Sequence, residues 1–157
     1  MSRFVVSYAL ERAVVSRVDK MDPVKKQVLK MAAIVGSFFE YRILKAMLPR
    51  ALTTKVRGKP SKLERAIYFL KQRGFIMDAS EGAFDESYLD SSSEDYKKML
   101  MQSGSLQLGN MDDDAILGFC NEMHRAIIYN MITSSDQKDG HNRVAHWIES
   151  TLSLIHI

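Results

Sequence analysis

The chain lacks the marks of several protein classes. It contains a single cysteine, Cys120, so an intramolecular disulfide cannot form, and this fits a reducing compartment. No apolar run approaches the roughly 18 residues that a membrane-spanning helix needs. The apolar part of the N-terminus is too short, and followed too soon by charge, for a secretory signal. These absences predict a cytoplasmic protein with neither a disulfide nor a membrane span.

Acidic residues are scarce in the first half of the chain and crowded after it. Residues 1–73 hold 17 Lys/Arg and 5 Asp/Glu, whereas residues 74–114 hold 2 Lys/Arg and 10 Asp/Glu. A basic half followed by an acidic segment can indicate nucleic-acid binding, an acidic partner surface, or contact between the two segments of the chain. Composition does not choose among the three. With 157 residues and 46% apolar content, the chain is long enough to bury a core.

Apolar residues at helical spacing predict six helices. Asp22 and Pro23 give an N-cap and a first helical residue, and Gly36 gives a stop. Ser61 and Glu64 form a capping-box pattern. The basic stretch from Arg50 to Pro60 is predicted to be a loop. The predicted helices span residues 5–18, 23–35, 40–47, 61–73, a stretch after Cys120 marked by Met123, Ile127, Ile128 and Met131, and a last stretch marked by Val144, Ala145, Trp147 and Ile148.

Two strand-like segments, 75–79 and 115–120, are predicted to pair as a hairpin. Between them lies a polar segment, 80–114, which is predicted to be a largely disordered acidic insert. Three helices followed by a hairpin is the order of a winged helix, with the helix from Ser61 to Arg73 in the recognition position. The predicted fold class is therefore mainly α with a small β-hairpin, a helical bundle that contains a winged-helix-like unit. We expect Trp147 to anchor the last helix against the body.

The sequence offers no catalytic or metal-binding constellation. No G-x-x-x-x-G-K-[ST] phosphate loop occurs. The run of acids from Asp112 to Asp114 is interpreted as a solvated charge run at a loop end. His141 and His146 are five residues apart, a poor fit to one helical face, and His124 lies across a strand–helix junction from Cys120. We therefore predict no catalytic residue, no cofactor-binding residue and no metal ligand in this chain.

The basic segment is the candidate interaction surface. Lys71 and Arg73 continue its charge along the predicted recognition helix, as a DNA-binding winged helix would require. The adjoining wing, however, carries acids such as Asp78, Glu81, Asp85 and Glu86, which would repel a phosphate backbone. A protein-facing or solvated surface is favoured over nucleic acid. The surface consists of Arg50, Lys55, Arg57, Lys59, Lys62 and Arg65.

Two stretches, 17–49 and 119–149, carry a family resemblance. The first contains R-V-D-K-M-D-P-V-K-K-Q-V-L-K-M-A-A-I-V-G-S-F-F, and the second contains F-C-N-E-M-H-R-A-I-I-Y-N-M-I and then H-N-R-V-A-H-W-I-E. In that order they resemble the helical and winged-helix region C-terminal to the nucleotide-binding domain of soluble (type 10) adenylyl cyclases and related signalling P-loop NTPases. One departure is S-S-D-Q-K-D-G at 134–140, where a continuous helix would be expected.

The resemblance implies a non-catalytic regulatory or coupling module of an adenylyl cyclase type 10-like protein. The parent would make cyclic AMP from ATP with a divalent metal, while the fragment itself would be no enzyme and hold no cofactor. Its partners would be the upstream NTPase and cyclase domains and the downstream helical repeats of the same protein. The alternative is a nucleic-acid-binding winged-helix domain of an NTPase-type transcriptional regulator.

The same resemblance divides the chain into segments. Residues 1–21 would be a helical linker from an upstream NTPase domain, and residues 22–120 a winged-helix-like domain with the insert at 80–114. Residues 121–151 would begin a C-terminal helical region. The last residues, 152–157, spell L-S-L-I-H-I, which resembles a translated sequencing adapter, although an ordinary helix can also end this way.

Overall fold

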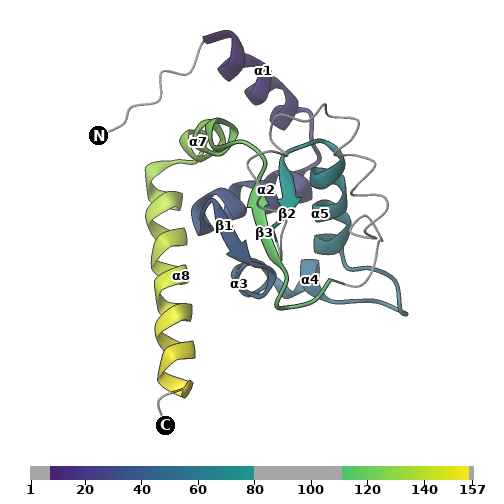
Figure 1. Ribbon diagram of the computed structural model, residues 1–157, viewed down its shortest axis with the longest axis vertical. Helices are drawn as coiled ribbons and strands as arrows, with labels where there is room; N and C mark the ends of the chain where they lie inside the picture. Colours follow the sequence, from purple (N-terminus) through teal and green to yellow (C-terminus); the bar gives the residue numbers. More distant parts are fainter. Residues whose placement is uncertain (1–7, 80–110, 156–157) are drawn as a thin grey trace.

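The computed structural model describes residues 8–79 and 111–155 and shows a mainly helical chain with a small three-stranded antiparallel sheet (Figure 1). The mainly α class predicted from the sequence is confirmed. The elements are α1 (Tyr8–Asp19), α2 (Pro23–Val35), β1 (Phe38–Glu40), α3 (Tyr41–Met47), α4 (Arg50–Thr53), α5 (Lys62–Gln72), β2 (Ile76–Asp78), β3 (Ile116–Phe119), α7 (Glu122–Asn130) and α8 (Ser134–Ile155).

Helix α2 lies at the centre of the fold, and both of its ends form as predicted. The Asp22 side chain accepts a hydrogen bond from the Lys25 backbone N–H at 3.0 Å, and Pro23 occupies the first turn, where no N–H is needed. At the other end the Gly36 N–H donates to the Ala32 carbonyl at 3.2 Å. The helix packs against α3, α5, α7 and α8. Its position explains why it carries five buried residues.

The sheet has the strand order β1–β3–β2 and is antiparallel throughout. Ile76 on β2 pairs with Phe119 on β3, so the predicted pairing of these two segments is confirmed. Strand β1, which pairs Phe38 with Gly118, was not predicted. Its three residues are too few to show the alternation that marks a strand. Glu40, predicted to begin the third helix, is the last residue of β1 and the N-cap of α3.

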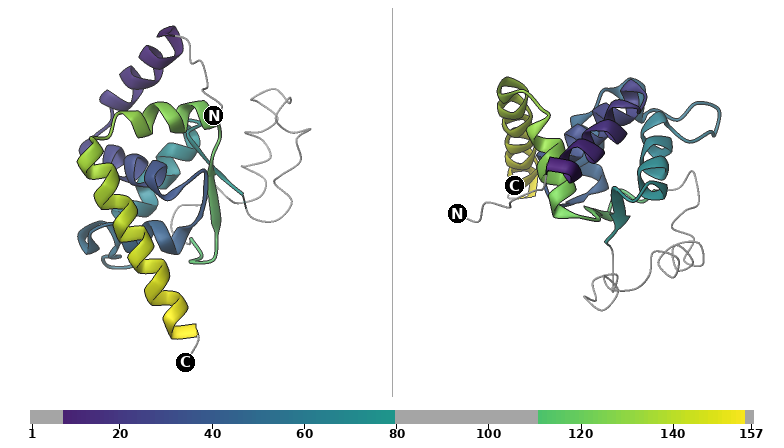
Figure 2. Two further views of the ribbon diagram at one scale, coloured as in Figure 1. Left: turned by 90° about the vertical axis from the view of Figure 1, so that its left-hand side faces the viewer. Right: turned by 90° about the horizontal axis from the view of Figure 1, so that it is seen from above.

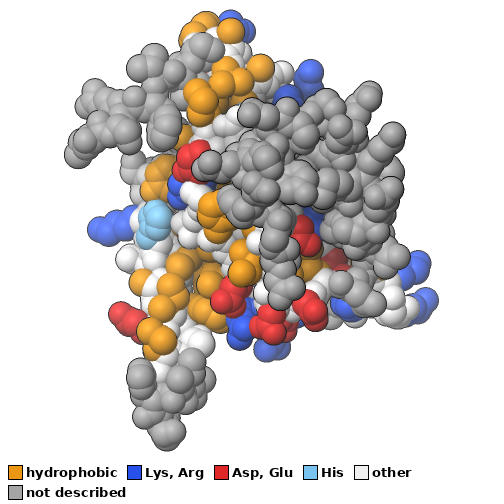
Figure 3. Space-filling view, in the orientation of Figure 1, with side chains coloured by type: hydrophobic (Ala, Val, Ile, Leu, Met, Phe, Trp, Pro, Cys, Tyr) orange, Lys and Arg blue, Asp and Glu red, His pale blue; other side chains and the backbone are white. Residues whose placement is uncertain are grey.

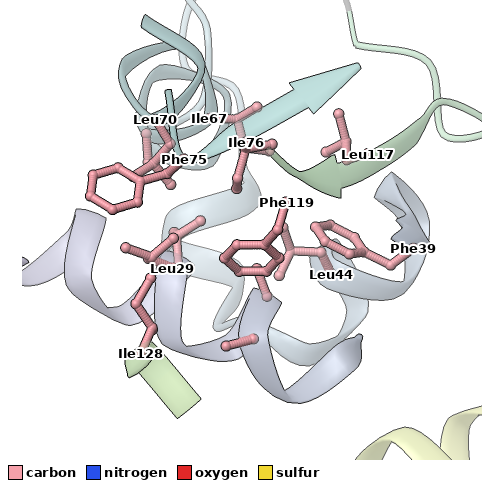
Figure 4. Close-up of a cluster of buried hydrophobic side chains, with 14 of the residues drawn as sticks. Leu29, Phe39, Leu44, Ile67, Leu70, Phe75, Ile76, Leu117, Phe119 and Ile128 are labelled. Carbon is pink, nitrogen blue, oxygen red and sulfur yellow. The ribbon is translucent and has the colours of Figure 1, made fainter. Parts of the chain in front are cut away.

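The core forms where α2, α3, α5 and α7 meet the inner face of the sheet (Figure 4). Apolar side chains from segments far apart in the sequence converge there and leave water, which supplies the main driving force for this arrangement. Its largest fully buried members include Leu29, Leu44, Ile67, Leu70, Phe75, Ile76, Leu117 and Ile128.

The predicted loop from Arg50 to Pro60 is wrong over its first four residues, which form helix α4. Pro49 precedes this helix as its N-cap, and the Leu52 N–H donates to the Pro49 carbonyl at 3.0 Å. Leu52 is buried against the core, and this burial holds the short helix in place. A single turn gives too little apolar periodicity to be recognised in the sequence.

Helix α8 is continuous from Ser134, so the 134–140 segment is not a helical break as its sequence suggested. Gly140 is buried against α2, and a Cβ there would lie 2.8 Å from Ile34 Cδ1. Its bare Cα therefore allows α8 to approach α2 closely. The Arg143 guanidinium donates to the Met47 carbonyl at 2.7 Å and links α8 to α3.

The far half of α8 projects beyond the body (Figures 1 and 2). Trp147, which is expected to anchor this helix, is half-buried, as is Val144, whereas the neighbouring Ile148 is 40% exposed. The anchoring role of Trp147 stays a prediction. Leu152, in the segment interpreted as a sequencing adapter, continues the helix and is also exposed. Although α8 has 22 residues, no helix within 8–79 and 111–155 is long and apolar enough to cross a membrane.

Candidate interaction surface

The six residues of the predicted basic surface lie on adjacent segments: α4, the loop after it, and the first turn of α5. Every one of them is exposed. The loop stands out from the body on the side opposite α8 (Figures 1 and 2). Figure 3 shows lysine and arginine side chains along that edge of the molecule. The fold therefore places together residues that the sequence separates by up to fifteen positions, namely Arg50, Lys55, Arg57, Lys59, Lys62 and Arg65.

The loop is closed by a tight turn at Arg57 and Gly58. Val56 and Lys59 form an antiparallel bridge, and the Lys59 N–H donates to the Val56 carbonyl at 3.0 Å. Both central residues have positive φ, 53° for Arg57 and 72° for Gly58, as in a type I′ turn. Glycine adopts this conformation freely, whereas a residue such as arginine does so at a cost of about 1 kcal/mol. The turn holds Arg57 at the exposed tip of the loop, beside Val56, which is 64% exposed.

The base of the loop is tied to the N-terminus of α5. The Glu64 N–H donates to Ser61 Oγ at 3.1 Å, and the Ser61 hydroxyl in turn donates to Glu64 Oε1 at 3.3 Å. Lys55 Nζ lies 3.6 Å from the same Oε1 atom. Burial, together with the Glu64 charge, raises the pKa of the nearby Tyr41 hydroxyl to about 12. The predicted cap at Ser61 is confirmed, and it fixes where the loop leaves the body.

Most of the charge on this surface is available to a partner. Lys55 pairs with Glu64, whose side chain is only 6% exposed. Within the part of the chain that the structure describes, Arg50, Arg57 and Lys59 make no ion pair, and the same holds for Lys62 and Arg65. Five solvated cations on a loop and a helix terminus form an electropositive surface suited to a carboxylate-rich or phosphate-rich partner.

The later basic residues of α5 do not extend this surface as the sequence suggested. Lys71 is buried, with 6% exposure, and burial lowers the pKa of its ammonium group. Arg73 is exposed, but its guanidinium lies 5.0 Å from the centroid of the Phe69 ring, and its carbonyl accepts a hydrogen bond from Arg17 at 2.6 Å. Lys71 follows Ile67 by four residues on the buried stripe, so helical spacing already indicated that it faces inward.

The acidic segment meets the body through its last residues. Arg42 on α3 forms ion pairs with Asp114 and with Glu40, and Lys45 lies 3.6 Å from Asp113. The three aspartates from Asp112 to Asp114 are exposed, as predicted for a solvated charge run, and two of them also pair with cations of α3. Asp78 is half-buried at the end of β2. The other predicted wing acids, Glu81, Asp85 and Glu86, lie outside the described residues, as does the insert over residues 80–110.

The histidines and the cysteine occupy separate environments. His141 shares a 2.8 Å hydrogen bond with the Tyr129 hydroxyl, which links α7 to α8. Burial, reinforced by the Arg17 charge, lowers the pKa of His124. Burial raises the pKa of the Cys120 thiol to about 11, so it is not a ready nucleophile at neutral pH. The described residues contain no group of three or more His, Cys, Asp or Glu side chains that could hold a metal ion.

The sequence did not predict the contacts by which Arg17 at the end of α1 packs against the rest of the fold. The Arg17 guanidinium lies 4.4 Å from the centroid of the buried Phe75 ring while it donates to the Arg73 carbonyl. His124 lies against the same ring, with centroids 5.9 Å apart. Arg17 was assigned to the apolar stripe of the first helix, so the spacing was visible, but its aromatic partner is 58 positions away. These contacts of Arg17 hold the C-terminal end of α1 beside α5 and α7.

Comparisons of this chain with protein-family models, with curated proteins and with solved structures found no match.

Proposed function

We propose that this chain is a non-catalytic coupling module of a larger signalling NTPase of the adenylyl cyclase type 10 kind, built on a winged-helix-like unit. The order α2, β1, α3, α5, β2, β3, with β3 in the middle of the sheet, supports the winged-helix assignment. In such a unit α5 holds the position of the recognition helix. The family assignment rests on the resemblance of the sequence. The proposed role of the module is to link the NTPase core of the parent protein to its C-terminal helical repeats.

The observation that carries this proposal is the basic surface, with five solvated cations on one side of a packed body. On the opposite side α8 projects with Ile148 and Leu152 exposed (Figure 1). One side thus suits an acidic protein surface, and the other suits apolar helical contacts. A module with two such sides can join an upstream NTPase domain to downstream helical repeats.

The alternative is that the basic surface binds the phosphate backbone of DNA. The solvated cations at the start of α5 favour it, because phosphate contacts come from exposed lysine and arginine. Two features favour a protein partner instead. The acids at the base of the wing, Asp113 and Asp114, lie against α3 and would repel a phosphate backbone. Lys71, on the predicted recognition helix, is buried and cannot reach a phosphate.

The test is docking of this chain onto the nucleotide-binding domain of a soluble adenylyl cyclase supplied in trans. The variant Lys55→Glu/Arg57→Glu/Lys59→Glu should weaken docking by about tenfold or more, because three attractive charges become repulsive. The matched control, Arg12→Glu/Lys20→Glu/Lys138→Glu, changes the net charge equally at exposed positions on α1, after α1 and on α8, and should leave docking unchanged. Circular dichroism first verifies that both variants are folded.

A DNA arm separates the two functions. The wild-type chain should bind duplex DNA only weakly, with strong salt dependence and without sequence preference. Binding to one duplex about a thousandfold tighter than to random DNA at physiological salt would establish the DNA-binding alternative. Equal loss of docking in the basic-surface variant and in its control would instead show that net charge alone governs docking, and the proposal would be wrong.

A further inference from the structure

A groove of about 510 Å³ runs between α2 and α8, away from the basic surface. Figure 2 shows α8 crossing beside α2, and the two helices pack against each other. On α2 the lining residues recur at helical spacing from Pro23 to Ile34. The eleven steps from Pro23 to Ile34 rise about 16.5 Å, so the groove follows about three helical turns.

The groove has an apolar floor and two walls of opposite charge. Pro23, which is exposed, and Met31, which is half-buried, give the floor its accessible apolar surface, and Ile34, 5% exposed, lies beneath it. Lys26 and Lys30, one turn apart on α2, line one wall, and Asp136 and Asp139 on α8 line the other. Arg143 also lines the α8 side, but its guanidinium donates a hydrogen bond to the Met47 carbonyl at 2.7 Å. In 8–79 and 111–155 none of these four lysine and aspartate side chains forms an ion pair, with one another or with any other residue. The two walls are therefore complementary in charge but separated by the groove.

We propose that this groove binds an amphipathic helix of a protein partner. The apolar face of that helix would cover Pro23 and Met31. Acidic residues on one flank would pair with Lys26 and Lys30, and basic residues on the other flank would pair with Asp136 and Asp139. The proposal concerns a second surface and does not depend on the function of the basic surface.

A helix fits this groove better than an extended peptide. Both walls are α-helices, whose backbone groups are already hydrogen-bonded along α2 and α8. An extended peptide gains affinity from main-chain hydrogen bonds to a sheet edge, and the groove has no such edge to give. A helix satisfies its own backbone and presents side chains at i, i+3, i+4 and i+7 to an apolar floor. The one-turn spacing of Lys26 and Lys30 matches acids one turn apart on the partner.

The probe is a synthetic helical peptide of about 14 residues with leucines on one face, glutamates on one flank and lysines on the other. Fluorescence anisotropy should give a Kd in about the micromolar range that rises with salt. Lys26→Glu/Lys30→Glu should weaken binding about tenfold, and Asp136→Lys/Asp139→Lys should do the same. The quadruple variant exchanges the walls. It should regain affinity because the peptide can enter in the reverse direction.

Two controls locate the peptide. Lys62→Glu/Arg65→Glu changes as many charges on the basic surface and should leave the Kd unchanged. Replacing the lysines of the peptide by glutamates tests the Asp136 wall without altering the protein, and it should weaken binding to a similar extent. A Kd above about 1 mM for the mixed peptide would overturn the proposal. So would double variants that bind as the wild type does, or a quadruple variant that binds no better than either double variant.

Discussion

Substituting Gly140 by alanine tests how closely α8 approaches α2. The added Cβ would lie 2.8 Å from Ile34 Cδ1 and 3.0 Å from its Cγ2, nearer than carbon atoms normally come. Ile34 is 5% exposed, so its side chain has little room to move away. The substitution thus sets a gain in helix propensity against a clash in the core.

Both effects have known sizes. Alanine is favoured over glycine inside a helix by about 0.8–1.0 kcal/mol. Forcing an extra carbon into a packed core costs about 1–3 kcal/mol. Gly140→Ala should therefore lower the free energy of unfolding by about 0–2 kcal/mol rather than raise it. In an Ile34→Val background the nearer atom, Cδ1, is absent while Cγ2 remains, so Gly140→Ala should be less destabilising than it is with Ile34. The expected coupling between the two positions is about 1 kcal/mol.

Urea unfolding of the wild type, both single variants and the double variant, followed by circular dichroism, measures this coupling. Asn142→Ala serves as the control, because Asn142 is exposed on the same helix and its effect should be the same in both backgrounds. The reasoning fails if Gly140→Ala raises the unfolding free energy by about 1 kcal/mol equally with Ile34 and with Val at position 34. That result would mean that α8 does not pack closely against α2 at this point.

Three further predictions follow from local contacts. Asp22→Ala should lower the unfolding free energy by about 1 kcal/mol through loss of the α2 cap, and Asp22→Asn, which keeps a capping oxygen, should lower it less in the same urea assay. The pKa of His124 is lowered in the folded state, so below the ordinary pKa of 6.5 the unfolded chain binds more protons than the folded chain, and the free energy of unfolding should fall as the pH drops below 6.5. His124→Gln should flatten this pH dependence, and an unchanged slope in that variant would contradict the prediction. Because burial raises the pKa of Cys120 to about 11, its thiol should react slowly with Ellman's reagent at neutral pH until urea unfolds the chain, and fast reaction of the folded chain would contradict its burial.

The elements that the sequence predicted well are those fixed by local chemistry. The cap at Asp22, the stop at Gly36 and the cap at Ser61 each depend on residues within four positions of one another. Spacing alone therefore sufficed to place α2 and α5. The elements that were missed depend on distant partners. Helix α4 exists because Leu52 is buried in the core, and β1 exists because β3 lies beside it.

Helix α8 also shows that contacts with distant residues, rather than local sequence alone, decide which residues are buried. Its polar start, with a glycine at 140, looks unfavourable for a helix on propensity. That glycine is nevertheless required, because Ile34 of α2 occupies the space where a side chain would lie. Conversely, Ile148 has the spacing of a buried residue but is 40% exposed, and Leu152 one turn later is 50% exposed. Periodicity identifies the apolar face of a helix, and only the position of the neighbouring elements decides whether that face is covered.

The charge pattern illustrates how much of the candidate surface the sequence could define. Composition left three explanations for a basic half followed by an acidic segment, including contact between the two. Arg42 and Lys45 of the basic half do pair with Asp114 and Asp113 of the acidic segment, so part of the excess charge is neutralised within the chain. The loop at Arg57 and the start of α5 remain outside these contacts and keep their charge in solvent. The cations available to a partner are therefore fewer than the basic residues of the first half, and they lie together on one side. Charge reversal there leaves the ion pairs of Arg42 and Lys45 on α3 unchanged.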